Sequence, residues 1–180
     1  MPITPKIMCD LYNFIDLKSP ADLALWCSFL VAFYCLFRKA NVAPKSLLSF
    51  NPSKDLSKQK FKILENDIIL VYNNFSKTNQ FMNRDAVIPL VKNSTVALDP
   101  IFHLKLLLSQ DISPQKPAFS YLERGVLKCI TYDVFTNRLK SLLTLAGYSP
   151  ALYGDHSFRR GGCNPPFPAW MLSTFDPGFG

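Results

Sequence analysis

The stretch LALWCSFLVAFYCLF, residues 23–37, is uncharged and strongly apolar, and it decides the fold. Ser19 is a potential N-cap before Pro20, and Asp22 suits the first turn of a helix, so we predict a helix that runs to about Arg38. The stretch is shorter than the roughly 20 residues that a bilayer-spanning helix needs. Because it is apolar on all sides, we expect this helix to lie at the centre of a globular domain.

The segment after this helix changes to β character. Pro44 prevents the helix from continuing, and the lysine-rich residues 51–60 are predicted to form a surface connection. Residues 68–72 (IILVY) and 86–88 (AVI) are rich in the β-branched and aromatic side chains that favour strands. We therefore predict a small antiparallel sheet of two or three strands within residues 61–90, with residues 76–78 at or beside a turn.

Two further helices are predicted. Asp99 followed by Pro100 is a helix start, and Thr131 is another. Apolar residues recur at helical spacing after each start, and Gly147 ends the second pattern; they are Ile101, Leu104 and Leu108, then Phe135, Leu139, Leu142, Leu143 and Ala146. The predicted fold class is therefore mainly α with a small antiparallel β-sheet, an α+β domain.

Composition restricts the kind of protein. The net charge of +7 favours an anionic partner such as nucleic acid. The cysteines form no CxxC pair and there are only two histidines, so neither a disulfide framework nor a metal site is predicted. No secretion signal is evident at the N-terminus. We expect reduced thiols, an intracellular location and no membrane partner.

Basic residues in three places are candidates for catalysis or ligand binding. Arg38 follows the apolar helix in LFRKANV (36–42), and Lys77 occupies the predicted turn in FSKTNQ (75–80). GDHSFRRGG (154–162) contains His156 and Arg159, which lie three residues apart. On a helix that spacing places both side chains on one face, so an imidazole and a guanidinium could converge on one phosphate.

Each of these segments also has a purely structural interpretation. GDHSFRRGG could be a helix start in which Asp155 or Ser157 caps the backbone amides. Arg38 could complement the negative end of a helix dipole. Lys77 could be an ordinary solvent-exposed turn residue.

Taken together, the order and spacing of these segments resemble the tyrosine recombinase family, and in particular the recombinases of eukaryotic DIRS and Crypton mobile elements. The resemblance covers residues 4–162 and implies a partial recombinase catalytic domain at 1–163. In that family a tyrosine attacks the scissile phosphodiester and is joined to the 3′ phosphate, without metal or cofactor. The motif match implies catalytic roles for Arg38, Lys77, His156 and Arg159, and DNA contacts from Arg38, Lys39, Lys77, Arg159 and Arg160.

The roles that the resemblance implies correspond to the charges that develop on the phosphate oxygens during the reaction. Arg38 and Arg159 would stabilise the non-bridging oxygens, and His156 would add a donor or move the nucleophile's proton. Lys77 would protonate the departing 5′ oxygen. Asn41 stands where the family often has a glutamate, and its amide could still orient the arginine by hydrogen bonding.

The sequence departs from the family after Gly162. The family continues with a helix, a second histidine or tryptophan and the nucleophilic tyrosine, whereas here prolines follow at once and no tyrosine occurs after Tyr153. Trp170 has surroundings unlike the family's. We expect residues 164–180 to be an irregular, aberrant tail. Tyr148 and Tyr153 are expected to pack or to cap the end of the third helix rather than act as nucleophiles.

The sequence thus predicts a nuclear DNA recombination or integration protein that binds duplex DNA and a scissile phosphate, together with other recombinase subunits. For lack of a tyrosine we expect it to be inactive alone. Two alternatives stay open, a non-catalytic DNA-binding module and a small basic helical domain that binds other proteins.

Overall fold

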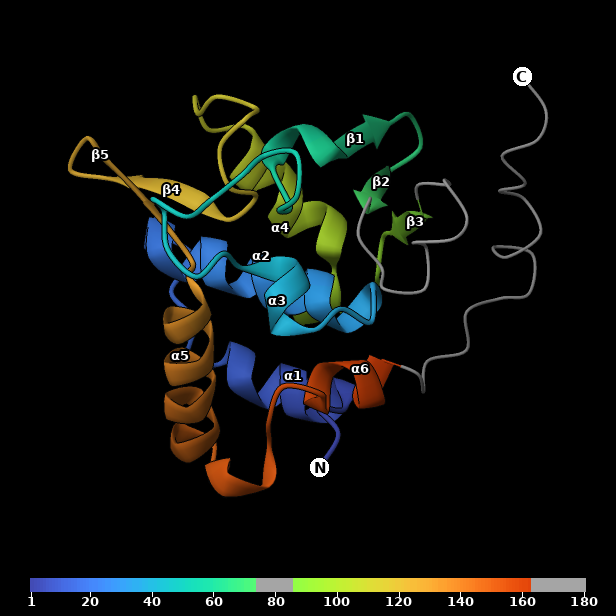
Figure 1. Ribbon diagram of the computed structural model, residues 1–180. Coiled ribbons are helices and arrows are strands. Elements are labelled where there is room, and N and C mark those ends of the chain that lie inside the picture. The colour runs from blue at the N-terminus through green and yellow to red at the C-terminus, as the bar shows by residue number, and fades with distance from the viewer. Residues whose placement is uncertain (74–85, 163–180) are drawn as a thin grey trace.

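The computed structural model describes residues 1–73 and 86–162 as a mixture of helices and small antiparallel sheets (Figure 1). Lys77 and the predicted tail, 164–180, lie outside the described residues. The helices are α1 (Pro5–Tyr12), α2 (Pro20–Tyr34), α3 (Lys39–Val42), α4 (Pro100–Leu108), α5 (Tyr132–Leu145) and α6 (Ser157–Gly162), with 3₁₀ turns η1 (Lys58–Lys60), η3 (Val96–Leu98) and η4 (Pro150–Leu152). The strands are β1 (Phe61–Leu64), β2 (Ile68–Asn73), β3 (Ala86–Val91), β4 (Ser120–Glu123) and β5 (Val126–Cys129). The predicted α+β class is confirmed.

Helix α2 is the centre of the core, as its uniform apolar character predicts. All its residues from Leu23 to Phe33 are buried, and α4, β4 and α6 pack against it. Its start is also as predicted, because the Ser19 hydroxyl accepts a hydrogen bond from the Asp22 amide at 3.3 Å. No helix among the residues that the structure describes is long and apolar enough to cross a membrane.

The end of α2 differs from the prediction, since the helix stops at Tyr34 rather than near Arg38. Leu36 has a φ of 56°, which lies in the left-handed region. The next amide, that of Phe37, donates back to the Ala32 carbonyl at 3.0 Å. This is the hydrogen bond of a Schellman turn, which closes a helix and redirects the chain. Hydrophobicity could not reveal it, because Leu36 and Phe37 are themselves apolar.

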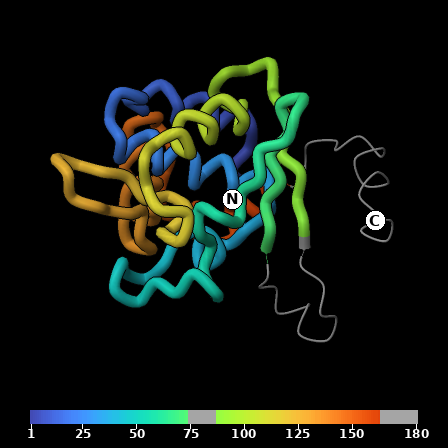
Figure 2. The backbone as a smooth tube through the Cα atoms, turned by 90° about the horizontal axis from the view of Figure 1, so that it is seen from above, coloured from blue at the N-terminus to red at the C-terminus, as the bar shows by residue number. Residues whose placement is uncertain are grey.

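The predicted sheet is confirmed as three antiparallel strands in the order β1-β2-β3. Ile69 pairs with Leu90 and Val71 with Ile88, and the buried faces of these strands join the core. A second sheet, the β4–β5 hairpin, was not predicted. The two sheets lie toward opposite edges of the molecule, with β4–β5 on the left and β1–β2–β3 on the right in both views (Figures 1 and 2).

The two further predicted helices are confirmed. The Asp99 carboxylate accepts from the Ile101 amide at 3.0 Å and begins α4. The Thr131 hydroxyl accepts from the Val134 amide at 3.4 Å and begins α5. Gly147 follows α5 with a φ of 84°, the left-handed geometry that suits a glycine after a helix. Helix α5 buries the predicted residues Phe135, Leu139, Leu142 and Leu143.

The surface connection predicted for residues 51–60 is wrong in its second half. Leu56 and Lys58 are each 6% exposed, and Lys60 is also buried. The Lys58 ammonium donates to the Ala118 carbonyl at 3.2 Å, and the Lys60 ammonium donates to the Asp55 carbonyl at 3.0 Å. Long lysine stems can pack on apolar surface while the ammonium finds a carbonyl oxygen. Ala118 is distant from Lys58 in the sequence, so composition alone does not reveal that Lys58 is buried.

Candidate nucleic-acid interface

Arg38 is positioned by the turn that ends α2. The turn buries Phe37, which is 6% exposed, and thereby points the chain so that the next residue, Arg38, is exposed. Arg38 is the N-cap residue of α3. The apolar helix thus supplies a rigid, buried support for a cation at its end.

Asn41 fixes the backbone of Arg38. Its side-chain oxygen accepts a hydrogen bond from the backbone N–H of Arg38 at 3.2 Å. The backbone N–H of Asn41 donates in turn to the Arg38 carbonyl at 2.8 Å. The side-chain amide of Asn41 therefore does hydrogen-bond to Arg38, as its residue type permits, and the bond is to the main chain.

The segment GDHSFRRGG divides into a buried face and an exposed face. Ser157, Phe158, Gly161 and Gly162 are buried, whereas the basic residues His156, Arg159 and Arg160 are exposed. Phe158 anchors the buried face, with its ring centroid 5.2 Å from Phe29 of α2 and 5.5 Å from Phe135 of α5. Since the buried residues share one side of α6, all the cations of this segment emerge on the other.

The paired glycines allow α6 to lie directly against other backbone. A Cβ atom on Gly161 would lie 1.5 Å from the Ile3 carbonyl oxygen, and one on Gly162 would lie 2.1 Å from the Phe33 carbonyl oxygen. The Ile3 amide also donates to the Ser157 carbonyl at 2.9 Å. These positions have no room for a side chain. The glycines therefore hold Arg159 at the end of α2.

A tight turn places His156 at the start of α6. The Ser157 hydroxyl accepts from the Gly154 amide at 2.9 Å, and the Ser157 amide donates to the Gly154 carbonyl at 2.9 Å. The His156 carbonyl accepts the Arg160 amide at 3.0 Å, which is the first helical hydrogen bond of α6. The segment is thus a helix start, as one structural interpretation proposed, but Ser157 binds the preceding turn.

Lys39 joins this turn to α3 and α5. Its ammonium lies 2.7 Å from a carboxylate oxygen of Asp155, 3.5 Å from the Thr136 hydroxyl and 4.6 Å from the centre of the Tyr132 ring. The Lys39 side chain is only 16% exposed. A surface pocket of about 210 Å³ adjoins this junction, and Phe135 and Tyr153 contribute to its walls.

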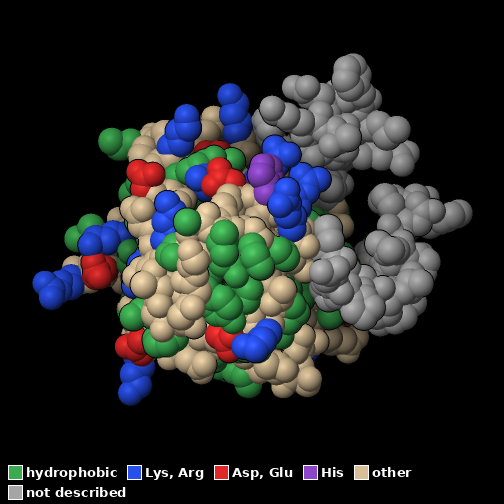
Figure 3. Space-filling model, turned by 90° about the horizontal axis from the view of Figure 1, so that it is seen from below, with side chains coloured by type: hydrophobic (Ala, Val, Ile, Leu, Met, Phe, Trp, Pro, Cys, Tyr) green, Lys and Arg blue, Asp and Glu red, His purple; other side chains and the backbone are tan. Residues whose placement is uncertain are grey.

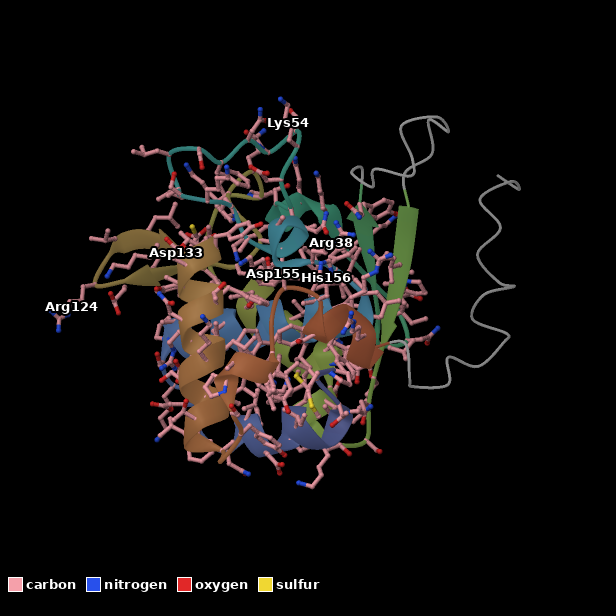
Figure 4. All side chains as sticks on the ribbon, turned by 60° about the horizontal axis from the view of Figure 1, so that its bottom comes forward. Arg38, Lys54, Arg124, Asp133, Asp155 and His156 are labelled. Carbon is pink, nitrogen blue, oxygen red and sulfur yellow. The ribbon has the colours of Figure 1, made fainter. Side chains whose placement is uncertain are left out.

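These contacts bring Arg38 close to the GDHSFRRGG segment. Asp155, at one end of the segment, contacts Lys39, and Gly162, at the other end, packs on Phe33 and Leu36. Figure 4 shows Arg38 beside Asp155 and His156. Figure 3 shows a histidine among Lys and Arg side chains on the same exposed face. We call Arg38, His156, Arg159 and Arg160 the basic cluster.

The side chains of the basic cluster are available to bind a ligand. Within residues 1–73 and 86–162, none of them forms a side-chain hydrogen bond or an ion pair. Each guanidinium presents a planar fork of N–H donors that matches two phosphate oxygens. A ligand with a phosphate group therefore fits this surface chemically.

Of the predicted site residues, the structure brings together Arg38, Lys39, His156, Arg159 and Arg160. Lys77 lies outside the described residues and falls between the β2 and β3 segments in the sequence. Asp155 was not predicted to take part, and its ion pair with Lys39 could not be inferred from the sequence because the partners lie on separate elements.

The two tyrosines before the histidine pack as expected. Tyr153 is 8% exposed, and its ring centroid lies 6.3 Å from that of Tyr148. The Tyr148 hydroxyl donates to the Asp10 carboxylate at 2.5 Å, which raises the pKa of Tyr148. Both side chains thus connect the end of α5 to the core.

Among the described residues, no group of three or more His, Cys, Asp or Glu side chains could hold a metal ion. No protein-family model matches the chain, and no curated protein matches it.

Proposed function

We propose that this chain binds duplex DNA through the basic cluster and holds one backbone phosphate between Arg38 and Arg159. The observation that carries the proposal is the convergence of cations from two distant parts of the sequence on one exposed face. The Lys39–Asp155 ion pair and the packing of Gly162 against Phe33 bring them there.

The proposed chemistry is that of a tyrosine recombinase, and the proposed fold is that family's catalytic domain. In-line attack on a phosphodiester builds negative charge on the non-bridging oxygens, which fixed guanidinium groups stabilise. His156 would donate a hydrogen bond or carry the nucleophile's proton, and Lys77 would protonate the leaving 5′ oxygen. The resemblance to recombinases of eukaryotic mobile elements implies a nuclear location.

The nucleophile is the part that these residues do not provide. Tyr153, which precedes His156 by three residues, is buried in the core. The proposal for these residues is therefore binding and orientation of the phosphate that a tyrosine nucleophile would attack.

Binding of a fluorescent duplex, followed by anisotropy over a range of salt concentrations, tests the proposal. Arg38→Gln and Arg159→Gln should each weaken binding about tenfold and reduce the salt slope by about 1, since each removes one phosphate contact. Arg124→Gln is the matched control, because Arg124 lies at the tip of the β4–β5 hairpin, far from the basic cluster (Figure 4).

The control separates a specific cluster from a general attraction by the net charge. If all three variants weaken binding equally, the affinity comes from overall charge and the basic cluster is not the site. If the wild-type chain does not bind duplex DNA, the proposed function is wrong.

A further inference from the structure

We propose that Lys39 and Asp155 are a positioning pair that sets the separation between Arg38 and the His156–Arg159 side of the basic cluster. This inference rests on the proposed function. It assigns Lys39 a role other than direct DNA contact, and it gives an acidic residue a favourable role in binding an anionic ligand.

The contacts of Lys39 are those of a connecting residue. Its ammonium reaches Asp155 at 2.7 Å, lies 4.6 Å from the centre of the Tyr132 ring and is 3.5 Å from the Thr136 hydroxyl. It therefore joins α3, α5 and the turn before α6. An ammonium over an aromatic face and next to a carboxylate has most of its charge already satisfied, so it is poorly placed to neutralise a phosphate.

Both members of the pair adjoin residues of the basic cluster. Lys39 follows Arg38, whose backbone is held by Asn41, and Asp155 precedes His156. Displacement of either partner therefore moves one side of the cluster relative to the other. Bidentate phosphate binding by separate elements depends on such a fixed separation.

The Lys39–Asp155 ion pair is mostly buried on the Lys39 side and open to solvent on the Asp155 side, so we expect it to contribute only modestly to folding stability. Asp155 is 51% exposed at its side chain, so solvent screens the attraction. We therefore expect its removal to leave the fold intact and to change the phosphate site. A variant that folds normally but binds DNA less tightly distinguishes a positioning residue from a structural one.

For the variant Asp155→Asn, a positioning role and a purely electrostatic role predict opposite changes in DNA affinity. Loss of a negative charge beside a DNA site should strengthen binding if only electrostatic attraction matters. If Asp155 holds Lys39 and the turn in place, the same variant should weaken binding by about three- to tenfold, the range expected for loss of one preorganising contact. Asp155→Glu, which keeps the carboxylate, should restore most of the affinity.

Lys39→Met provides the second test. If Lys39 positions Arg38 and does not touch a phosphate, this variant should weaken binding but leave the salt slope unchanged, whereas loss of a phosphate contact reduces the slope by about 0.9. Lys39→Arg should bind more tightly than Lys39→Met, because it keeps a cation beside Asp155.

The control for these variants is Asp133→Asn. Asp133 is exposed in the first turn of α5 and forms no ion pair with another described residue, so it loses the same charge without disturbing Lys39. Hydrogen exchange without DNA is a readout that does not depend on the proposed function. Asp155→Asn should speed exchange of the Ser157 and Arg160 amides, which bond to Gly154 and His156 in the turn, and Asp133→Asn should not.

The outcomes separate the inference from the proposed function. If the wild-type chain binds DNA, Arg159→Gln weakens binding and Asp155→Asn binds as tightly as wild type or more tightly, the positioning role is wrong and the proposed function stands. A reduced salt slope for Lys39→Met would also overturn it, because Lys39 would then contact a phosphate. If the wild-type chain does not bind DNA, the proposed function fails, and the exchange rates of the Ser157 and Arg160 amides alone decide whether the pair fixes the turn.

Discussion

Gly162 packs on Phe33 with no space for a side chain. A Cβ atom on Gly162 would lie 2.1 Å from the Phe33 carbonyl oxygen and 2.5 Å from a side-chain carbon of Leu36. The first of these atoms belongs to the backbone of the central helix and cannot move aside. The close approach fixes α6, and with it Arg159, against the end of α2 just before Arg38.

We predict that Gly162→Ala destabilises the protein by about 2–3 kcal/mol, the range for overpacking against fixed atoms, which outweighs the roughly 1 kcal/mol that alanine gains in helix propensity. Urea unfolding measures this change. Gly154→Ala is the control, since a Cβ atom there meets no atom within 4 Å. Equal stability of the two variants would show that α6 does not pack in this way.

Lys58 is predicted to make stability depend on pH. Burial lowers the pKa of Lys58 from 10.5 to about 8. Between about pH 8 and 10.5 the unfolded chain binds a proton at this lysine and the folded chain does not, so the contribution of Lys58 to the free energy of unfolding rises with pH. Below pH 8 both states are protonated, and the folded state carries the full cost of the buried charge.

Lys58→Met should therefore stabilise the protein at pH 7. The relieved cost is about 3 kcal/mol from the change in pKa, and loss of the hydrogen bond to the Ala118 carbonyl offsets about 1 kcal/mol of it. The advantage over wild type should shrink as the pH rises from 8 to 10.5. Chemical denaturation of both proteins across this range checks it, with the exposed Lys62→Met as control. A constant difference at all pH values would mean that Lys58 is not buried in its charged form.

The buried His103 is predicted to be neutral with its proton on Nδ1. Nδ1 lies 2.7 Å from the Asp99 carbonyl oxygen, which can only accept, so this nitrogen donates. Nε2, 3.1 Å from the Tyr12 hydroxyl, then accepts from Tyr12. Nitrogen-15 NMR of the imidazole should show this tautomer at pH 7, and the opposite tautomer would contradict the hydrogen-bond network.

Tyr12→Phe should cost about 1–3 kcal/mol, because it leaves Nε2 of His103 buried without a donor. Burial lowers the pKa of His103, so wild-type stability should fall as the pH drops below about 6.5, where the unfolded chain takes up a proton that the folded chain resists. Thermal unfolding at pH 7 and pH 5 measures both effects. If a His103→Gln variant loses as much stability between pH 7 and pH 5 as wild type, groups other than His103 cause that loss.

Cys27 and Cys35 are predicted to resist thiol reagents in the folded protein. Both are buried in or next to α2, and burial raises the pKa of each thiol, so little thiolate forms. Cys9 is partly exposed and should react first among the three. Mass spectrometry after brief alkylation measures the order. Rapid labelling of Cys27 under native conditions would contradict the packing of α2.

The sequence allowed the helices with strong local signals to be predicted. Ser19, Asp99 and Thr131 each precede a helix and accept its first amides, which depends only on neighbouring residues. The same logic applies to Thr4, whose hydroxyl accepts from the Ile7 amide at 3.3 Å at the start of α1, although that helix was not predicted.

The features that could not be predicted depend on contacts between distant segments. The end of α2 is set by the backbone of Leu36, and the burial of Lys58 by the carbonyl of Ala118. In the candidate site, the residue types at Arg38 and Arg159 suggested a phosphate ligand, but the ion pair that holds their elements together joins Lys39 to Asp155 across the fold.

The most direct measurement of the central claim is a double-mutant cycle in duplex DNA binding, made from Arg38→Gln, Arg159→Gln and the double variant. Two side chains that hold the same phosphate are coupled, so the double variant should lose clearly less binding free energy than the sum of the single losses. A cycle of Arg38→Gln with the distant Arg124→Gln should be additive. Additive losses for Arg38 and Arg159 would contradict a shared phosphate.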